Sequence, residues 1–398
     1  MRFVWLIVAM LMAVAVAAPA LADDPPVPLA ANGLAQTPPM GWNSWNKFGC
    51  DNSEATVRAT ADAMAASGMR DAGYRYLVID DCWQGKRDKD GFIQADASKF
   101  PSGIKALADY VHGKGLKFGI YSDAGEQTCG HRPGSQGHEY QDALQYARWG
   151  VDYLKYDWCS AGTRNAEEAY RTMALALRAT GRPIVFSICE WGTSKPWLWA
   201  TNTGNLWRAT GDIWDHWQGP NANGYSLGVM DIADLDAPLW PFAGPGHWND
   251  ADMLEVGNGG MTDDEYRAHF SLWAMLASPL MAGNDVAHMT PAVRSILLNK
   301  AVIAVDQDAL GEQGRRIDDR GDQEVWMKPL SGGARAVLFL NRGAAPATIG
   351  VKWGALGYPD RLPAMVTDLW SNQVNRGVAG AIERQVSPHA VVMLRIDP

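Results

Sequence analysis

From about Thr37 to Asp308 the chain alternates short apolar runs with longer amphipathic stretches. The runs have the length of buried strands, and the stretches between them have the apolar spacing and the terminal glycines of helices. Strand and helix repeated along this length predict an α/β fold, a (β/α)8 TIM barrel. The predicted strands are 40–45, 76–80, 116–121, 153–157, 184–189 and 206–210, and the predicted helices include 54–66, 104–112, 138–149 and 165–180.

Two further helix starts lie in the later part of this region. Thr262 and Glu265 have the spacing of a capping box, and Pro291 after Thr290 occupies the first position of another helix. A doubly wound open sheet is the alternative α/β arrangement. No Gly-x-Gly-x-x-Gly follows a predicted strand, so a dinucleotide-binding fold is not supported.

From about Gly311 the pattern changes to strand-like segments separated by glycine, proline and asparagine, with no helix between them. This pattern predicts a small antiparallel β-sandwich. We therefore place the (β/α)8 barrel at residues 37–308 and the C-terminal β-sandwich domain at 309–398. Its predicted strands are 324–328, 334–340, 348–353, 365–370 and 390–395.

The N-terminus has the pattern of a secretory signal peptide. Arg2 supplies the positive charge, an apolar run follows, and Ala20 and Ala22 form a small-x-small cleavage site. We expect residues 1–22 to be the signal peptide, 23–36 to be a leader, and the protein to be secreted or periplasmic. A retained membrane anchor is the alternative, but the run is short. After signal removal we expect no membrane association.

The formal net charge of −9 and the pI near 5.4 argue against partners that are nucleic acids or anionic membranes. Export makes the five cysteines interpretable as disulfide partners, with one left free. No cysteine or histidine cluster has the spacing of zinc ligands, so we expect neither a metal nor a cofactor. Nothing in the sequence predicts an oligomeric state.

Polar and aromatic residues gather where the predicted strands end. The active sites of (β/α)8 barrels lie at the carboxyl ends of their strands. A single aspartate at a strand end would most simply be a helix cap, but six strand ends carry carboxylates or aromatics. The polar and aromatic residues at these strand ends are Trp45, Asp80, Asp81, Tyr121, Asp123, Lys155, Asp157, Glu190, Trp191, Arg208 and Asp212. Asp252 lies in a later loop, 248–252.

Lys155 and Asp157 lie two residues apart on a predicted strand, so their side chains point to the same face. A lysine beside a carboxylate favours the ionised form, which a nucleophile needs. A plain ion pair at a strand end is the alternative. Asp212 is the candidate for a second, protonated carboxyl. Arg208 would lower its pKa and Asp157 would raise it, and the sequence leaves that balance open.

Carboxylates, a lysine and an arginine, flanked by aromatic residues, suit a neutral polyhydroxylated ligand. The chain has 18 tryptophans, whose indole rings can cover the apolar face of a sugar. Two carboxylates acting on one glycosidic bond is the usual arrangement of glycoside hydrolases. The sequence therefore favours a glycosidase.

Six sequence motifs narrow the glycosidase prediction to one family. Segments 40–46, 79–83, 154–159, 189–192, 207–212 and 248–258 resemble glycoside hydrolase family 27, the melibiase-type α-galactosidases. The resemblance implies a (β/α)8 barrel followed by a C-terminal antiparallel β domain. It also implies a retaining exo-glycosidase acting on terminal α-D-galactosyl residues of a galactoside, with Asp157 as nucleophile and Asp212 as acid/base.

The same resemblance implies roles for the other strand-end residues. Asp80 and Asp81 would bind galactose O4 and O6, Lys155 and Arg208 would bind ring hydroxyls, and Asp252 would join Arg208 near O2. Trp45 and Tyr121 would form the aromatic lining, and Glu190 and Trp191 the O2 side. The implied disulfides are Cys50–Cys82 and Cys129–Cys159, which leaves Cys189 free and buried.

Three alternatives stay open. Relatives that act as α-N-acetylgalactosaminidases have smaller residues where Glu190 and Trp191 stand here. Relatives that act as β-L-arabinopyranosidases are expected to crowd the C6 side, whereas Asp80 and Asp81 favour galactose. From other classes, the chain could be a non-catalytic galactose-binding protein, or an inverting hydrolase with carboxyl groups about 6.5–9.5 Å apart rather than about 5–5.5 Å.

Overall fold

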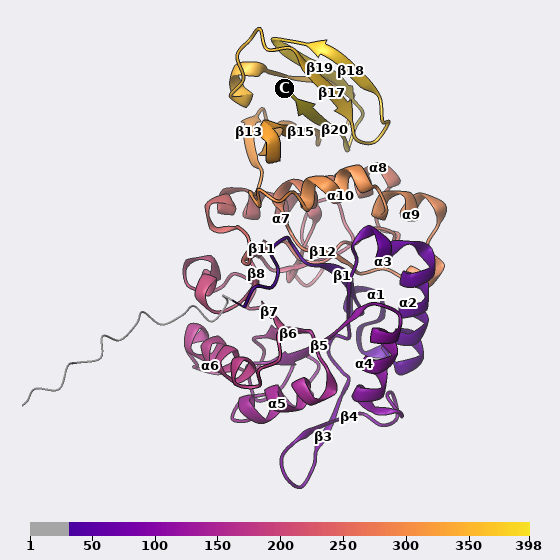
Figure 1. The fold of residues 1–398 in the computed structure, drawn as a ribbon, viewed down its shortest axis with the longest axis vertical. Coiled ribbons are helices and arrows are strands. Elements are labelled where there is room, and N and C mark those ends of the chain that lie inside the picture. The colour runs from indigo at the N-terminus through magenta and orange to yellow at the C-terminus, as the bar shows by residue number, and fades with distance from the viewer. Residues whose placement is uncertain (1–31) are drawn as a thin grey trace, which may run out of the picture.

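Eight parallel strands curl into a barrel, and an antiparallel β domain follows it, in a computed structural model that describes residues 32–398 (Figure 1). The expected signal peptide, 1–22, and most of the expected leader, 23–36, lie outside the described residues. Within residues 32–398 no helix has the length and apolar character needed to cross a membrane.

The barrel sheet has the strand order β11-β8-β7-β6-β5-β2-β1-β12, and every neighbouring pair is parallel. A parallel bridge between Leu254, just beyond β11, and Ala282 of β12 joins the two edges. The expected fold class is confirmed. The strands are β1 (Met40–Asn43), β2 (Tyr76–Val78), β5 (Lys117–Asp123), β6 (Tyr153–Asp157), β7 (Val185–Ile188), β8 (Leu206–Arg208), β11 (Trp248–Asp250) and β12 (Leu280–Ala282).

Two barrel strands were not predicted. The segment expected to be a loop, 248–252, begins with β11, and β12 was not recognised at all. Both strands are three residues long and fully buried, so neither shows the alternation that marks a strand. The first strand is also shorter than expected, because Trp45 begins the short helix α1 (Trp45–Phe48).

The four predicted helices differ from α2, α4, α5 and α6 by one residue at one or both ends. The capping box is present, with Thr262 Oγ1 accepting from the Glu265 amide and the Glu265 carboxylate accepting from the Thr262 amide. The connection from β7 to β8 contains only 3-10 turns. The helices are α2 (Glu54–Ser67), α3 (Met69–Ala72), α4 (Gly103–Gly113), α5 (Glu139–Trp149), α6 (Ala166–Ala179), α7 (Val229–Asp236), α8 (Asp263–Leu276), α9 (Pro291–Leu297) and α10 (Lys300–Asp306).

The C-terminal domain packs a six-stranded antiparallel sheet, β13-β14-β15-β20-β17-β18, against the pair β16-β19. Three strands were missed: β13 and β18, which lie at the sheet edges and are polar or exposed, and the largely polar β19. The strands are β13 (Arg315–Asp319), β14 (Gln323–Pro329), β15 (Arg335–Asn341), β16 (Ala347–Lys352), β17 (Ala364–Asp368), β18 (Val374–Val378), β19 (Ala381–Val386) and β20 (Ala390–Asp397).

Both faces of the large sheet are covered. On β15, Val337 and Phe339 point into the sandwich core, whereas Leu338 and Leu340 join the core that continues into the barrel. Helix α8 lies between the barrel and this sheet (Figure 1) and is buried on nearly every side, as expected of a helix packed between two layers. Lys328 of β14 donates to the Ala274 carbonyl at 2.9 Å. The C-terminal domain thus covers one side of the barrel.

We predict that Leu338→Ala destabilises the whole protein by about 2–5 kcal/mol, because it leaves a cavity where the sheet meets the barrel core. Leu235→Ala is the control, since that side chain is 52% exposed and should change stability little. Denaturant unfolding midpoints measure both. An unchanged midpoint for Leu338→Ala would mean that the C-terminal sheet does not support the barrel.

Candidate active site

A pocket of about 340 Å³ lies at the carboxyl ends of the barrel strands. Ten of the eleven residues expected in the catalytic and binding site line it: Trp45, Asp80, Asp81, Tyr121, Lys155, Asp157, Trp191, Arg208, Asp212 and Asp252. Four of them lie on the barrel strands β5, β6 and β8, Trp45 begins α1, Asp212 begins the short strand β9 (Asp212–Ile213), and the others lie in loops after β2, β7 and β11. The eleventh, Glu190, does not line the pocket.

Asp157 ends β6 and is almost completely buried. Its Oδ2 accepts a hydrogen bond from the Tyr121 hydroxyl at 3.0 Å, and its Oδ1 accepts one from the Trp158 amide at 2.9 Å. The pKa of Asp157 is raised to about 7. Burial is the main cause and the charge of Asp212 adds to it, whereas the charge of Lys155 lowers the pKa. The carboxyl group is thus held in place by two donors and titrates near neutral pH.

The spacing of Lys155 and Asp157 on the strand had suggested that the two side chains pair, but Lys155 does not form an ion pair with Asp157. Its Nζ instead lies 2.9 Å from Asp80 Oδ2, which also accepts from the Asn43 side chain at 2.6 Å. Both strand neighbours face the pocket as expected. The lysine charge still lowers the pKa of Asp157, but the loss of hydration outweighs it. Lys155 thus favours the ionised form of Asp157, as expected, but burial has the larger effect on the pKa of Asp157.

Backbone amides fix the side chain of Asp81. The Cys82 amide donates to Oδ1 at 2.6 Å, and the Gly130 amide donates to Oδ2 at 2.6 Å. Cys82 itself has a φ of 71°, an uncommon backbone conformation for a non-glycine residue, and is tied by a disulfide to Cys50. Burial raises the pKa of Asp81. Its orientation is therefore set before any ligand arrives.

Arg208 connects two carboxylates. Its Nη2 lies 3.0 Å from Asp212 Oδ1 and 2.9 Å from Asp252 Oδ2, and Asp252 Oδ2 also accepts from the Ile213 amide at 2.8 Å. The guanidinium is buried, whereas the side chain of Asp212 is 50% exposed. Asp212 therefore stands at the solvent side of the pocket, and Asp157 at the buried side.

Glu190 lies behind the pocket wall. It is fully buried, and its Oε2 accepts from the Ser194 amide at 2.6 Å. Burial raises its pKa to about 7. Its neighbour Trp191 lines the pocket with a φ of 57°, and this turn directs one residue into the pocket and the other into the protein. Only Trp191 of the expected pair is placed to touch a ligand.

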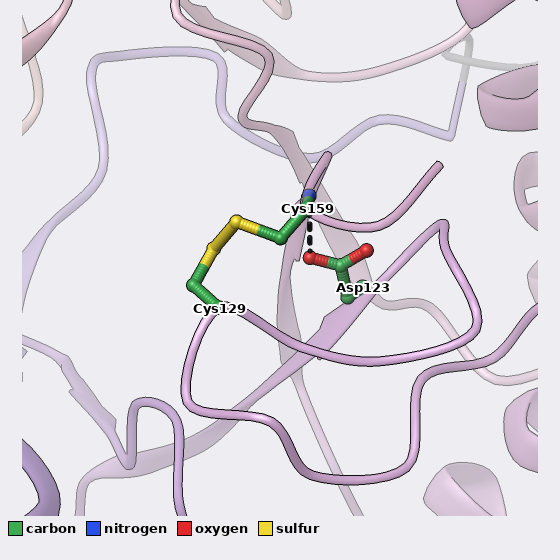
Figure 2. Close-up of side chains that lie close together, drawn as sticks. All are labelled: Asp123, Cys129 and Cys159. Carbon is green, nitrogen blue, oxygen red and sulfur yellow. Dashed lines mark hydrogen bonds between the residues drawn. A yellow bond between two sulfur atoms is a disulfide. The ribbon is translucent and has the colours of Figure 1, made fainter. Parts of the chain in front are cut away.

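The disulfides are Cys50–Cys82 and Cys129–Cys159, and Cys189 is free and buried, as the resemblance implied. Figure 2 shows Asp123 beside the second disulfide, with its Oδ2 accepting from the Cys159 amide at 2.9 Å. Among residues 32–398 these three residues form the only cluster with metal-ligand geometry. The two sulfurs are bonded to each other and offer no thiolate, so the cluster braces the loop after β6.

Seven residues that line the pocket were not predicted from the sequence: Asn46, Ile213, Trp214, Asp215, Ser226, Glu255 and Asn258. Cys129 also lines it and was expected only as a disulfide partner. For some of these residues the sequence does contain a pattern that indicates a place in the site. Asn46, Glu255 and Asn258 belong to the segments on which the resemblance was based, and both asparagine side chains donate to the Glu255 carboxylate. Trp214 and Asp215 stand in an acidic and aromatic run directly after Asp212.

Comparisons with known proteins agree with this geometry. The family model for alpha galactosidase A matches residues 37–308, and that for the alpha galactosidase C-terminal beta sandwich domain matches 320–396. The chain is 54% identical over 377 residues to alpha-galactosidase A of Cellvibrio japonicus, covering 92% of this chain and 93% of that one.

Two solved structures are similar over 92% of this chain. Alpha-galactosidase I from Mortierella vinacea has 40% identity and a TM-score of 0.90, with 98% of that chain covered. The α-galactosidase from Saccharomyces cerevisiae with raffinose has 33% identity and a TM-score of 0.87, with 99% of that chain covered. With a fold, a pocket and two family models in agreement, the chain belongs to glycoside hydrolase family 27, the melibiase-type α-galactosidases.

Proposed function

We propose that the protein is a secreted, retaining α-galactosidase that removes terminal α-D-galactosyl residues from galactosides. Asp157 is the nucleophile and Asp212 is the acid/base. The observation that carries this proposal is the contrast between the two carboxyl groups. One is buried and held by two hydrogen-bond donors, and the other is half exposed, beside it in a single pocket.

In the first step the Asp157 carboxylate attacks the anomeric carbon from the face opposite the leaving group. The glycosidic bond breaks as Asp212 gives its proton to the leaving oxygen. The product is a β-galactosyl ester of Asp157. In the second step Asp212 takes a proton from water, the water oxygen attacks the same carbon, and Asp157 leaves as the carboxylate. Two inversions release α-galactose.

The hydrogen bonds to Asp157 support this division of roles. Tyr121 and the Trp158 amide fix the direction of its two oxygens, so the carboxylate is already oriented for attack on the anomeric carbon. Its ester is neutral, so the repulsion between Asp157 and Asp212 disappears once the intermediate forms. That change helps Asp212 to act first as an acid and then as a base.

Recognition of galactose rests on Asp80 and Asp81. Both are buried and fixed by protein donors, so they form rigid acceptors for the axial O4 and for O6. A glucosyl residue would leave the O4 acceptor unpaired. Trp191 closes the side where an acetamido group would have to fit. The relative solved with raffinose supports oligosaccharides that end in galactose as the substrate class.

Export is supported by the signal-like N-terminus and by the two disulfides, which persist in oxidising compartments. One of them ties Cys129, which lines the pocket, to the loop directly after Asp157.

A panel of p-nitrophenyl glycosides tests the function. We expect the α-galactoside to be hydrolysed well above the α-N-acetylgalactosaminide and the β-L-arabinopyranoside. Asp157→Asn should lower kcat by roughly 10³-fold or more and still bind galactose. NMR of the first-formed sugar should show α-galactose.

The other outcomes each point elsewhere. First-formed β-galactose would identify an inverting hydrolase. Preference for another sugar would overturn the roles given to Trp191 or to Asp80 and Asp81. If the wild type binds galactose but hydrolyses none of the glycosides, the protein is a non-catalytic galactose-binding protein.

The pH profile tests the environment of Asp157. Because the nucleophile must be ionised, kcat/KM should fall as pH drops below about 7, the pKa of Asp157 in the free protein. Lys155→Met removes the charge that lowers this pKa, so the acid limb should move up by about one pH unit. Lys105→Met, at an exposed site on α4, is the control. An acid limb that stays in place in Lys155→Met would contradict the assignment.

A further inference from the structure

A second, much smaller cavity adjoins the pocket inside the barrel. Its volume is about 20 Å³, and its lining comes from β1, β6, β7, β8, β11 and β12 and from the turn after β11. Because six of the eight barrel strands contribute to the lining, this cavity lies in the barrel interior. Lys155, Arg208 and Asp252 line both the cavity and the pocket. These three side chains therefore separate the two spaces.

Charged residues line this interior cavity. The interior of a (β/α)8 barrel is normally filled by branched apolar side chains. Here Lys155, Arg208 and Asp250 line it, each from a barrel strand. Asn43 and Ser187 add an amide and a hydroxyl group. Withdrawing charges from water is costly unless they find partners, so these residues need polar contacts inside the barrel.

Asp250 is the charged residue of this group for which the proposed mechanism has no use. It ends β11, is 8% exposed, and is the register partner of Arg208 on β8. Its Oδ1 accepts from the Asp252 amide at 2.9 Å, but no donor among residues 32–398 bonds to its Oδ2. In the described part of the chain no acceptor bonds to Arg208 Nε either. Two residues that line the cavity thus have a polar atom available to a molecule inside it.

A water molecule is the occupant that fits this cavity. A buried water needs roughly 10–15 Å³ and two to four polar partners, and it commonly bridges groups that lack partners in the protein. The volume admits one water and nothing as large as a sugar. A water can donate to the Asp250 carboxylate and accept from Lys155 or Arg208. It would thereby join this carboxylate to the two cations that line the pocket.

The charges around the cavity favour an ionised Asp250. Burial raises the pKa of Asp250 to about 6, while the charges of Arg208 and Lys155 lower it. At neutral pH the carboxyl group is therefore mostly ionised. No direct ion pair joins it to either cation within residues 32–398, because these cations pair with other carboxylates. The contact between Asp250 and the cations therefore runs through the cavity.

We propose that Asp250 is a positioning residue which, through one ordered water in this cavity, holds Lys155 and Arg208 on the side opposite the ligand. The proposal rests on the proposed function, because it requires both cations to bind hydroxyl groups of the galactosyl residue. Long cationic side chains lose much conformational freedom when a ligand fixes them, and a partner behind them fixes them beforehand. Asp250 thus strengthens galactose binding without touching the sugar.

Two variants of Asp250 test this role. Asp250→Leu keeps a branched side chain and removes both oxygens, so the dissociation constant of galactose, measured by isothermal titration calorimetry, should rise about 5- to 20-fold. Asp250→Asn keeps polar atoms for the Asp252 amide and for a water, so it should recover part of this loss. An unchanged dissociation constant in Asp250→Leu, or equal losses in the two variants, would overturn the proposal.

Asp306→Leu is the matched control. Asp306 is a buried carboxyl group, 1% exposed, but it lies on α10 and lines neither the pocket nor the cavity. This variant should lower the midpoint of thermal unfolding and leave the dissociation constant of galactose within about twofold of the wild type. A similar loss of affinity in Asp306→Leu would show that binding simply follows stability, and would contradict a positioning role for Asp250.

The wild-type protein supplies a test that needs no variant. A crystal structure that resolves ordered water should show one in this cavity, within hydrogen-bond distance of Asp250 Oδ2 and of Lys155 Nζ or Arg208 Nε. A cavity without that water, or a water that contacts neither cation, would rule the proposal out. A wild type that binds galactose but hydrolyses no galactoside would overturn the proposed function alone, because affinity and the water are both measured without turnover.

Discussion

The withdrawal of the Asp157 carboxyl group from water is the constraint on which the rest of the site depends. Burial alone favours the protonated form, which cannot attack a sugar. The charge of Lys155 and the hydrogen bond from the Trp158 amide oppose this, and the pKa of Asp157 lies at about 7. The Tyr121 hydroxyl donates to the same carboxyl group and helps to hold it in place. The proposed nucleophile is therefore partly ionised at neutral pH and has little water around it to compete with the sugar.

The parallel barrel makes this arrangement possible. Asp123 and Asp157 are register partners on β5 and β6, and the Asp123 carboxylate accepts from the Cys159 amide, two residues beyond Asp157. The disulfide from Cys159 to Cys129 then joins this loop to the pocket wall. The C-terminal sheet covers α8, and Leu338 and Leu340 of this sheet belong to the same hydrophobic core as the barrel strands β11 and β12. The barrel strands that hold the active-site residues thus share a core with the C-terminal domain, and this core connects the stability of that domain to the geometry of the site.

The sequence predicts most of what depends on local pattern. Helices such as α2 and α6 have clear apolar spacing and caps, and the strand ends that carry Asp80, Asp157 and Arg208 could be located from short apolar runs. The pocket unites ten of the eleven predicted site residues because parallel strands all end at one rim.

The remainder depends on contacts that no local pattern encodes. The three-residue strands β11 and β12 are too short to show a period. The partner of Lys155 is Asp80 from a distant strand, not the Asp157 two residues away. Glu190 and Trp191 are adjacent in sequence, yet a left-handed turn sends only the tryptophan into the pocket. Each of these outcomes is set by tertiary packing.

The most direct test is to trap the intermediate with 5-fluoro-α-galactosyl fluoride. The ring fluorine destabilises the oxocarbenium-like transition state, and the fluoride leaves readily, so a galactosyl ester should accumulate. After reduction and digestion, mass spectrometry of the peptide 156–164 identifies the modified residue. The account predicts the fluorogalactosyl group on Asp157. A label on Asp212, or an enzyme that turns over galactosides and never becomes labelled, would contradict it.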